Sequence, residues 1–298
     1  MPLRPDISVV TLTWNNAADV DVMLRSLFAD AKRSGLRAEV LAIDNGSTDA
    51  TPALLRRHAA RFAQLKPLIL GSNLGTTVSR NIGIRLARAE HVLLLDSDTR
   101  IPPGELARLL TSFERIPTPR ERIGLIHPRL TYPDGTFQES ARRFPTLLTK
   151  LYRLTRWEDA RVRDESIDAV LAGQVTPVDY AISAAWLVPR RVFADIGLLD
   201  ERIFYSPEDV EFCARCWRHG YEVWYDPGVA IVHDCQRLTA RKPLSRLGLS
   251  HVQGLLRLWR SYGFFPTRTS IAPRSPPRSA AAATPTAPDS AALQATAR

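Results

Sequence analysis

Residues 91–102 read HVLLLDSDTRIP, in which an apolar run leads directly into two aspartates one residue apart. An uninterrupted apolar run of this length is typical of a strand that is covered on both faces, as in a parallel sheet. Asp96 and Asp98 would then lie at the carboxyl end of a buried strand. Two carboxylates held this close repel each other, so water, a cation or a catalytic function must account for the pair.

The chain upstream of this strand alternates between strand and helix patterns. Strand-like and helix-like runs follow one another at residues 7–13, 20–32, 39–43, 51–62, 67–70, 75–89 and 91–95. This βαβαβαβ order with short connections predicts the α/β class, with a Rossmann-like, mostly parallel sheet flanked by helices. Downstream we expect four more strands and a short helix, at residues 123–127, 179–189, 222–225, 230–233 and 207–219, respectively.

The overall composition indicates a globular protein with anionic partners. The chain has 298 residues, of which 45% are hydrophobic and 24% charged, and its formal net charge is +9. A basic balance favours phosphorylated small molecules, an anionic membrane surface or nucleic acid. No basic face interleaved with aromatic residues stands out, so we expect no nucleic-acid partner.

The cysteines and the apolar stretches indicate a cytoplasmic protein. Cys213, Cys216 and Cys235 are the three cysteines, and this low, odd count suits a reducing compartment better than a disulfide framework. Cys213 and Cys216 lack the second matched pair of a zinc site, so we expect packed side chains. No signal-peptide core opens the chain, and no apolar stretch approaches the roughly 20 residues of a membrane-spanning helix. We expect a cytoplasmic location, either free or peripheral at the inner face of the cell membrane.

Polar residues follow each of the first four predicted strands. Ligands of an open α/β sheet bind at the carboxyl ends of its strands, so these residues mark a candidate ligand site. In chain order, they are Thr11, Thr13, Trp14, Asp44, Asn73, Asp96, Ser97 and Asp98.

The chemistry of these residues suggests a nucleotide that carries a diphosphate. Trp14 offers a flat face for stacking on a base, and Asp44 either accepts hydrogen bonds from base or ribose or simply completes a turn. The helix that begins near Gly75 would present free N–H groups to phosphate, and Arg80 on it is either a phosphate ligand or a surface charge. The carboxylates of the aspartate pair suit Mg²⁺ or Mn²⁺, which would bridge a diphosphate and remove their repulsion.

The motifs of this chain resemble those of family 2 glycosyltransferases with the GT-A fold. The closest resemblance is to the rhamnosyltransferase-like branch, whose members build bacterial surface polysaccharides. The resemblance covers about residues 6–235. It rests on VVTLTWNN, IDNGSTDAT, SNLGTTVSRNIGIRLA, LLLDSDTRIP, HPRLTYPDGTFQESARRFP and AAWLVPRRVFADIGLLDERIFYSPEDVEFCARCWRHGYEVWYDPGVAIVH.

The resemblance implies a role for each matching residue. Asp96 and Asp98 would hold the metal, and His233 would add a further metal or diphosphate ligand. Asp209 would be the catalytic base, although on spacing alone it is equally a carboxylate that stabilises a helix N-terminus. The implied nucleotide-sugar-binding set consists of Thr11, Thr13, Trp14, Asp44, Asn73, Arg80, Asp96, Ser97 and Glu208.

Two departures from the family pattern leave the donor sugar open. The branch usually has small or aromatic residues and a second asparagine after Gly75, where this chain has Thr76, Thr77 and Arg80. The residue after His233 is often His or Gly in the branch, whereas here it is Asp234, followed by Cys235.

The resemblance implies an inverting, metal-dependent glycosyltransferase. The enzyme would move rhamnose or another hexose from a nucleotide-diphosphate donor to a glycan or lipid-linked acceptor in cell-surface polysaccharide biosynthesis. One alternative is a nucleotidyltransferase of similar fold, but the glycine-rich, basic loop expected after the first strand is absent. Another is a non-catalytic subunit of an assembly complex, in which the carboxylate sites would be degraded. All four carboxylates are present, at Asp96, Asp98, Glu208 and Asp209.

The chain divides into four predicted parts. Residues 1–122 would form the nucleotide-sugar-binding half and residues 123–240 the acceptor-binding, catalytic half of one GT-A domain. Residues 241–265 would form an amphipathic helix and residues 266–298 a disordered Pro/Ala-rich tail. The helix, over 242–262, either packs on the domain or binds an anionic membrane surface. Its apolar face would consist of Leu244, Leu247, Val252, Leu255, Leu256, Trp259 and Tyr262, and its basic face of Lys242, Arg246, Arg257 and Arg260.

Overall fold

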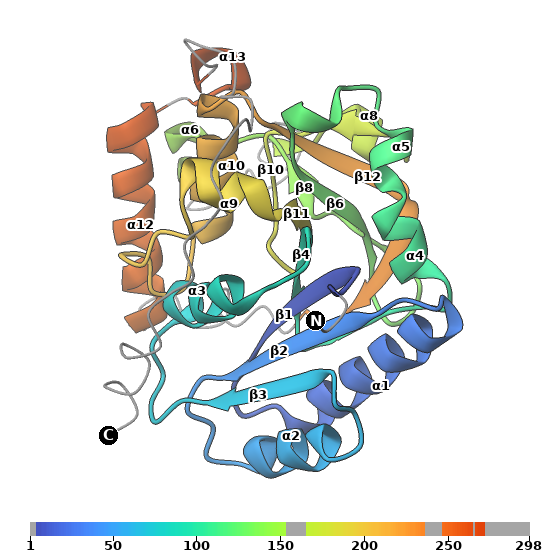
Figure 1. The fold of residues 1–298 in the computed structure, drawn as a ribbon. Helices are drawn as coiled ribbons and strands as arrows, with labels where there is room; N and C mark the ends of the chain where they lie inside the picture. Colours follow the sequence, from blue (N-terminus) through green and yellow to red (C-terminus); the bar gives the residue numbers. More distant parts are fainter. Residues whose placement is uncertain (1–3, 153–164, 236–245, 265, 272–298) are drawn as a thin grey trace.

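The computed structural model describes residues 4–152, 165–235, 246–264 and 266–271, and its centre is a single ten-stranded sheet (Figure 1). Seven elements form the N-terminal half: β1 (Ile7–Thr13), α1 (Ala17–Arg33), β2 (Ala38–Asp44), α2 (Thr51–Ala59), β3 (Leu65–Ile69), α3 (Thr76–Leu86) and β4 (His91–Asp96). Strands β3, β2, β1 and β4 lie side by side in that order and are all parallel. The predicted βαβαβαβ unit and the α/β class are therefore confirmed.

The remaining elements add strands to the same sheet and form a separate two-stranded sheet. They are β5 (Thr99–Arg100), α4 (Glu105–Leu110), α5 (Ser112–Arg115), the 3₁₀ turn η1 (Arg120–Arg122), β6 (Ile123–Thr131), β7 (Phe137–Gln138), β8 (Ala141–Arg142), α6 (Leu147–Tyr152), α8 (Asp168–Leu171), β9 (Thr176–Pro177), β10 (Tyr180–Ala181), β11 (Ala185–Pro189), α9 (Arg190–Ile196), α10 (Glu208–Arg218), β12 (Glu222–His233), α12 (Arg246–Tyr262) and α13 (Arg268–Ile271). Strand β11 is antiparallel to both neighbours, β4 and β6, whereas β12 runs parallel to β6. Both predicted halves thus contribute strands to one sheet.

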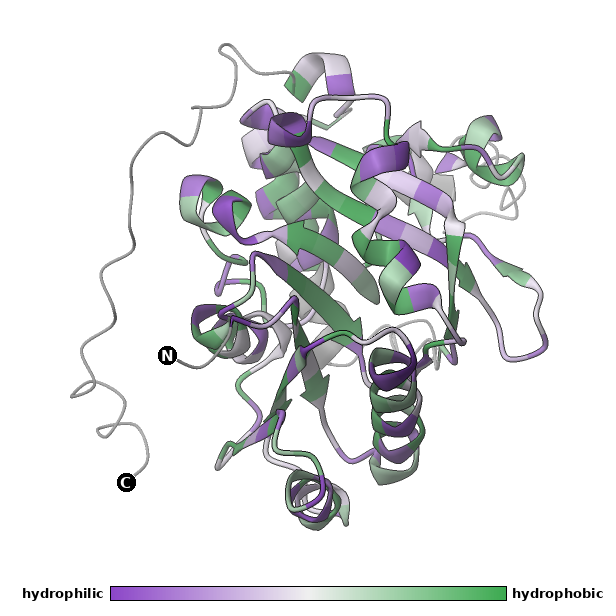
Figure 2. Ribbon diagram, turned by 45° about the vertical axis from the view of Figure 1, so that its right-hand side comes forward, coloured by the Kyte–Doolittle hydropathy of each residue, from purple (hydrophilic) through white to green (hydrophobic). Residues whose placement is uncertain are grey.

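The sheet is covered on both faces, which explains the uninterrupted apolar run in β4. Leu93 and Leu95 belong to a core shared with α1, α2 and α4, whereas Val92 and Leu94 belong to a second core shared with α3, α9, α10 and α12. Successive side chains of a strand point to opposite faces, so a strand buried on both faces has no polar alternation. Figure 2 shows this pattern, with the apolar colouring concentrated on the strands and the polar colouring on outward-facing helix surfaces.

Two of the predicted strand boundaries are wrong. The apolar run at 179–189 forms two strands, β10 and β11, and not one. Between them, the N–H of Ile182 donates to the Ser140 carbonyl, and β11 then pairs with β4. Conversely, residues 222–225 and 230–233 belong to one strand, β12, whose register with β6 shifts between Asp226 and Ala230. The first break brings Ser183 close to the carboxyl end of β4, where it becomes part of the candidate site.

The predicted amphipathic helix exists, but its apolar residues divide between core and solvent. Leu255, Leu258 and Trp259 of α12 are buried in the second core, whereas Val252 and Leu256 are exposed. A Cβ atom at Gly254 would lie 2.4 Å from Pro207 Cδ, so α12 packs closely against the segment that precedes α10. Of the residues predicted for this helix, 242–245 lie outside the described part of the chain.

Four residues of the predicted disordered tail, 266–298, form a helix in the structure. Residues Arg268–Ile271 form the short helix α13, in which Ile271 is buried and Arg268 pairs with Asp179 at 2.8 Å (Nε to Oδ1). The buried contact and the ion pair offset the low helix propensity of this segment. Residues 272–298 lie outside the described residues. Within the part of the chain that the structure describes, no helix is both long enough and apolar enough to cross a membrane.

Candidate active site

Asp96, Asp98 and His233 converge at the carboxyl end of β4. Asp96 ends β4, Asp98 occupies the following turn, and strand β5 then pairs with β12 so that Thr99 lies opposite His233. The Nε2 atom of His233 lies 3.4 Å from Asp98 Oδ1 and 4.0 Å from Asp96 Oδ2. Residues far apart in the chain are thus joined by the register of a two-residue strand.

The geometry of these three side chains fits a divalent cation. One ligand atom from each residue lies within 4.8 Å of the others. Ligand atoms about 2.1 Å from an octahedral cation are about 3.0 Å apart at right angles and about 4.2 Å apart across it. The separations of 3.4 and 4.0 Å from His233 Nε2 lie within that window. Two carboxylates and one imidazole are also suitable donors for Mg²⁺ or Mn²⁺.

The electrostatics of the cluster also indicate a missing positive charge. Burial raises the pKa of Asp96 and the nearby Asp98 raises it further, whereas Arg80 opposes both effects. Burial lowers the pKa of His233, but the hydrogen bond and the charge of Asp98, with Asp96 and Asp234, outweigh it and leave that pKa raised. A divalent cation at this position would satisfy both carboxylates.

Arg80 contacts Asp96 and links the cluster of Asp96, Asp98 and His233 to a second pair of carboxyl groups, Glu208 and Asp209. Its guanidinium donates hydrogen bonds to Asp96, to Ser183 Oγ at 2.7 Å and to Glu208 Oε1 at 3.4 Å. Only 3% of Arg80 is exposed. It is therefore neither a surface charge nor an open phosphate ligand; it is a buried cation shared by Asp96 and Glu208.

Two of the N–H groups near the start of α3, which the sequence predicted to be free for phosphate, have partners in the structure. Gly75 N–H donates to Asn73 Oδ1 at 2.9 Å, and Thr76 N–H donates to the Phe204 carbonyl at 2.7 Å. Gly75 has a φ of +87°, and a Cβ atom there would lie 2.5 Å from the Phe204 oxygen. The segment before α10 therefore closes the helix N-terminus that the sequence predicted to be open.

The other predicted nucleotide-binding residues lie at different depths. Trp14 is 47% exposed and offers its ring at the rim, as expected for a stacking residue. Asp44 is buried, and its Oδ1 accepts hydrogen bonds from Thr13 Oγ1 at 3.0 Å and Ser47 Oγ at 2.6 Å. Thr11 is enclosed within the sheet between β2 and β4, so it does not face the rim.

Asn73 and Ser97 are hydrogen-bonded to two asparagines that were not among the predicted site residues. Asn73 is exposed, and its Oδ1 accepts a hydrogen bond from Asn45 Nδ2 at 2.9 Å. Ser97 Oγ accepts a hydrogen bond from Asn16 Nδ2 at 2.7 Å. Asn16 and Asn45 stand inside the quoted motifs, but nothing in their spacing indicated these contacts.

Glu208 and Asp209 open α10 on the other side of Arg80. Glu208 is buried and accepts a hydrogen bond from Ser183 Oγ at 2.9 Å. Burial, followed by the charge of Asp209, raises the pKa of Glu208 to about 8 in spite of the opposing charge of Arg80. Asp209 is half-buried, and its Oδ1 accepts a hydrogen bond from the N–H of Val210 at 2.8 Å. One carboxylate is therefore held inside and the next reaches the surface.

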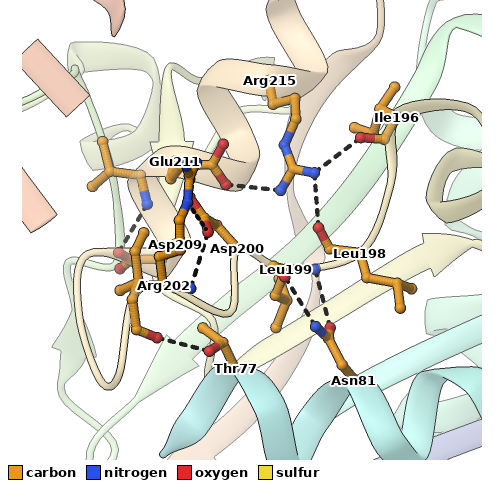
Figure 3. A network of polar contacts seen from close by, with 12 residues as sticks. Thr77, Asn81, Ile196, Leu198, Leu199, Asp200, Arg202, Asp209, Glu211 and Arg215 are labelled. Atoms are coloured by element: carbon orange, nitrogen blue, oxygen red, sulfur yellow. Dashed lines mark hydrogen bonds and ion pairs between the residues drawn. The ribbon is translucent and has the colours of Figure 1, made fainter. Parts of the chain in front are cut away.

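The position of α10 is set by contacts with the segment between α9 and α10 (Figure 3). The Nη1 atom of Arg215 donates to the Ile196 and Leu198 carbonyls at 2.9 and 2.7 Å. Asn81 of α3 donates to the Leu199 carbonyl at 2.9 Å and accepts from its N–H at 3.0 Å. These bonds join α3, which carries Arg80, to α10, which carries Asp209.

Comparison with known proteins identifies relatives over most of the chain. Residues 8–152 match the family model described as "Glycosyl transferase family 2", and residues 91–272 match "Glycosyl transferase family group 2". A Mycobacterium tuberculosis protein named N-acetylglucosaminyl-diphospho-decaprenol L-rhamnosyltransferase is 29% identical over 295 residues, which cover 90% of this chain and 91% of the relative. A Haloferax volcanii protein, the low-salt glycan biosynthesis hexosyltransferase Agl10, is 25% identical over 77% of this chain and 67% of the relative.

Solved structures show the same fold at lower identity. The mannosyltransferase PcManGT from Pyrobaculum calidifontis, in complex with GDP-Man and Mn²⁺, superposes with a TM-score of 0.58 at 18% identity. GalNAc-T7 with UDP, GalNAc and Mn²⁺ also gives a TM-score of 0.58, at 17% identity. This chain spans 65% and 43% of the length of those two proteins, respectively, and 86% and 77% of it is covered.

Replacement of Arg80 by methionine should strongly destabilise the protein. Arg80→Met leaves Asp96 and buried Glu208 without their shared cation, and we expect the free energy of unfolding to fall by about 3 kcal/mol. That is the low end for a broken buried pair, because the Asp96 side chain is 33% exposed. Urea unfolding of the metal-free protein measures the effect.

The matched control is Arg85→Met on the same helix. Arg85 pairs with Glu201, and both side chains are exposed, so its loss should cost under about 1 kcal/mol. The double variant Arg80→Met/Glu208→Gln should recover part of the lost stability. Equal losses in the two single variants would contradict the role assigned to Arg80.

Proposed function

This chain belongs to glycosyltransferase family 2, and on that basis we propose that it is an inverting, metal-dependent enzyme that uses a nucleotide-diphosphate sugar. The proposal rests on the convergence of Asp96, Asp98 and His233 at the carboxyl end of β4, which Arg80 links to Glu208, the neighbour of Asp209. Family membership favours this function over a nucleotidyltransferase or a non-catalytic subunit.

The donor would lie across the carboxyl ends of β1, β2 and β4. Trp14 would stack on the nucleobase, and Asp44 would contact the nucleobase near Ser47. Asp96, Asp98 and His233 would hold Mg²⁺ or Mn²⁺, which when bound neutralises the charge that grows on the departing diphosphate. Arg80 would keep Asp96 in place from behind, because its guanidinium is committed to that carboxylate and to Glu208.

Asp209 would act as the catalytic base toward the acceptor. A sugar hydroxyl is a poor nucleophile at neutral pH, and a positioned carboxylate can accept its proton as it attacks the anomeric carbon. Asp209 suits this role because it is half-buried at the start of α10, whereas Glu208 is buried and bonded to Ser183 and Arg80. A single base and a direct attack give inversion at the anomeric carbon.

The relatives support a particular class of donor and acceptor. The Mycobacterium tuberculosis relative is named for the transfer of L-rhamnose to N-acetylglucosaminyl-diphospho-decaprenol, and the match covers 91% of that protein. We propose that this chain transfers rhamnose or another hexose to a glycan or lipid-linked acceptor in cell-surface polysaccharide biosynthesis. The Mn²⁺ and nucleotides bound in PcManGT and GalNAc-T7 support a nucleoside-diphosphate donor with a divalent cation.

A lipid-linked acceptor would bring the enzyme to the inner face of the cell membrane. Helix α12 supports such a contact, because Val252 and Leu256 are exposed one turn apart and Arg257 and Arg260 are exposed beside them. Apolar side chains would enter the interface while the arginines bind anionic headgroups. Leu255, Leu258 and Trp259 of the same helix are buried in the core.

Asp209→Asn should strongly reduce sugar transfer without weakening the binding of the donor. A panel of nucleotide sugars, tested with Mn²⁺ or Mg²⁺, should first identify the donor. We expect wild type and variant to bind that donor with similar affinity. Transfer by the variant should fall by about 10²–10⁴-fold, because the variant lacks the catalytic base. The residues proposed to bind the metal and the nucleobase are unchanged. Calorimetry and product analysis measure the two quantities.

Glu211→Gln on the same helix is the control, since Glu211 pairs with Arg215 and has no proposed catalytic role. Near-normal transfer by the Asp209 variant would show that the base is elsewhere. The absence of metal-dependent binding of every donor to the wild type would contradict the proposed function itself.

Val252→Ser/Leu256→Ser should weaken binding to anionic vesicles while leaving the protein folded. Both side chains are exposed, at 51% and 43%, so their replacement removes interfacial contacts and not core packing. We expect several-fold less co-sedimentation with phosphatidylglycerol-containing vesicles. Val22→Ser on α1 is the control, because Val22 is 50% exposed on a helix with no proposed membrane role. Unchanged sedimentation of the double variant would refute the membrane contact.

A further inference from the structure

The ring of His233 is held between the candidate metal site and a buried glutamine. Its Nε2 atom faces Asp98 and Asp96, and its Nδ1 atom lies 2.8 Å from Oε1 of Gln138. Both His233 and Gln138 are buried, at 4% exposure each. Neither the family motifs nor the spacing of the chain assigns Gln138 a function.

We propose that Gln138 is a positioning residue that fixes the tautomer and the orientation of His233 for metal binding. This inference rests on the proposed metal site. An amide oxygen can only accept a hydrogen bond, so Nδ1 of His233 must carry a hydrogen. In the neutral imidazole the lone pair then belongs to Nε2, the nitrogen that faces the two aspartates. The side chain of Gln138 thus selects the nitrogen that can bind a cation.

The same hydrogen bond serves the site with and without a cation. In either state Nε2 faces the aspartates and Nδ1–H donates to Gln138. The ring therefore need not turn for a cation to be bound at Nε2. A partner on the second nitrogen of a histidine ligand is a general means of orienting the ring.

The sheet holds Gln138 at this position. Strand β7 is antiparallel to β6, with Gln138 opposite Leu130, and β6 is parallel to β12, with Leu130 opposite Ile231. Gln138 and His233 therefore extend from strands on either side of β6. The residue is also uncharged, and a carboxylate here would add a further negative charge to a site that already holds Asp96 and Asp98.

A matched test is available in the same hairpin. Ser140 Oγ lies 2.8 Å from Nε2 of buried His127, whose Nδ1 lies 2.9 Å from the Ala185 carbonyl oxygen. Ser140→Ala therefore removes a buried partner from a histidine that faces no aspartate pair. Gln138→Leu removes the partner of His233, and Gln138→Glu keeps an acceptor at the same place.

The experiment is a titration of each protein with Mn²⁺ alone, followed by the electron paramagnetic resonance signal of the free ion. We expect Gln138→Leu to bind Mn²⁺ about 10–100-fold more weakly than wild type and Ser140→Ala to bind close to wild type. Gln138→Glu, which keeps the acceptor and adds a negative charge, should bind at least as tightly as wild type. Affinity of Gln138→Leu equal to that of wild type would overturn the inference, as would an equal loss in Ser140→Ala. Wild type that binds no Mn²⁺ would overturn the proposed metal site as well.

A nuclear magnetic resonance measurement tests the tautomer directly in the wild-type protein. The ¹⁵N shifts of the His233 ring, assigned with His233→Gln, should show Nδ1 protonated both before and after addition of Mg²⁺. A Mg²⁺-bound ring with Nδ1 deprotonated would contradict the role of Gln138.

Discussion

The active site depends on one buried cation, Arg80, that two carboxylates share. Asp96 belongs to the proposed metal site and Glu208 adjoins the proposed base, and Arg80 contacts both. An unpaired charge at this depth costs several kcal/mol, so neither carboxylate can move far without leaving the guanidinium unsatisfied. The donor side and the acceptor side of the site are thereby held at a fixed separation.

The segment that precedes α10 completes this arrangement. Its carbonyl at Phe204 accepts the N–H of Thr76, and its Pro207 lies against Gly254 of α12. Helix α3 therefore binds this segment at its N-terminus, while α12 supports it from outside. The membrane contact proposed for α12 would lie on a helix that packs against the residue preceding Glu208 and Asp209.

The N-terminal half of the fold was predictable because its signals are local. Each strand of the βαβ units is one apolar run, and each ends in polar residues such as Asp44 or Asp96 that mark the same edge of the sheet. The C-terminal half was less predictable because buried strands carry no polar alternation, so the break at Ile182 and the antiparallel direction of β11 leave no trace in the pattern.

Within the site, residue types were predictable but their partners were not. The carboxylates and His233 were identified from motifs, whereas the burial of Arg80 and the closure of the α3 N-terminus by Phe204 depend on residues more than a hundred positions away. Gln138 likewise has no sequence signal, because a two-residue strand brings it to His233.

We propose that Asp96, Asp98 and His233 bind one divalent cation together. Anomalous diffraction at the manganese edge, from crystals grown with Mn²⁺ and a nucleoside diphosphate, can locate that cation. We expect one strong peak within coordination distance of a carboxylate oxygen of each aspartate and of His233 Nε2, with the diphosphate on its open side. A bound nucleoside diphosphate with no peak among these three side chains would contradict it.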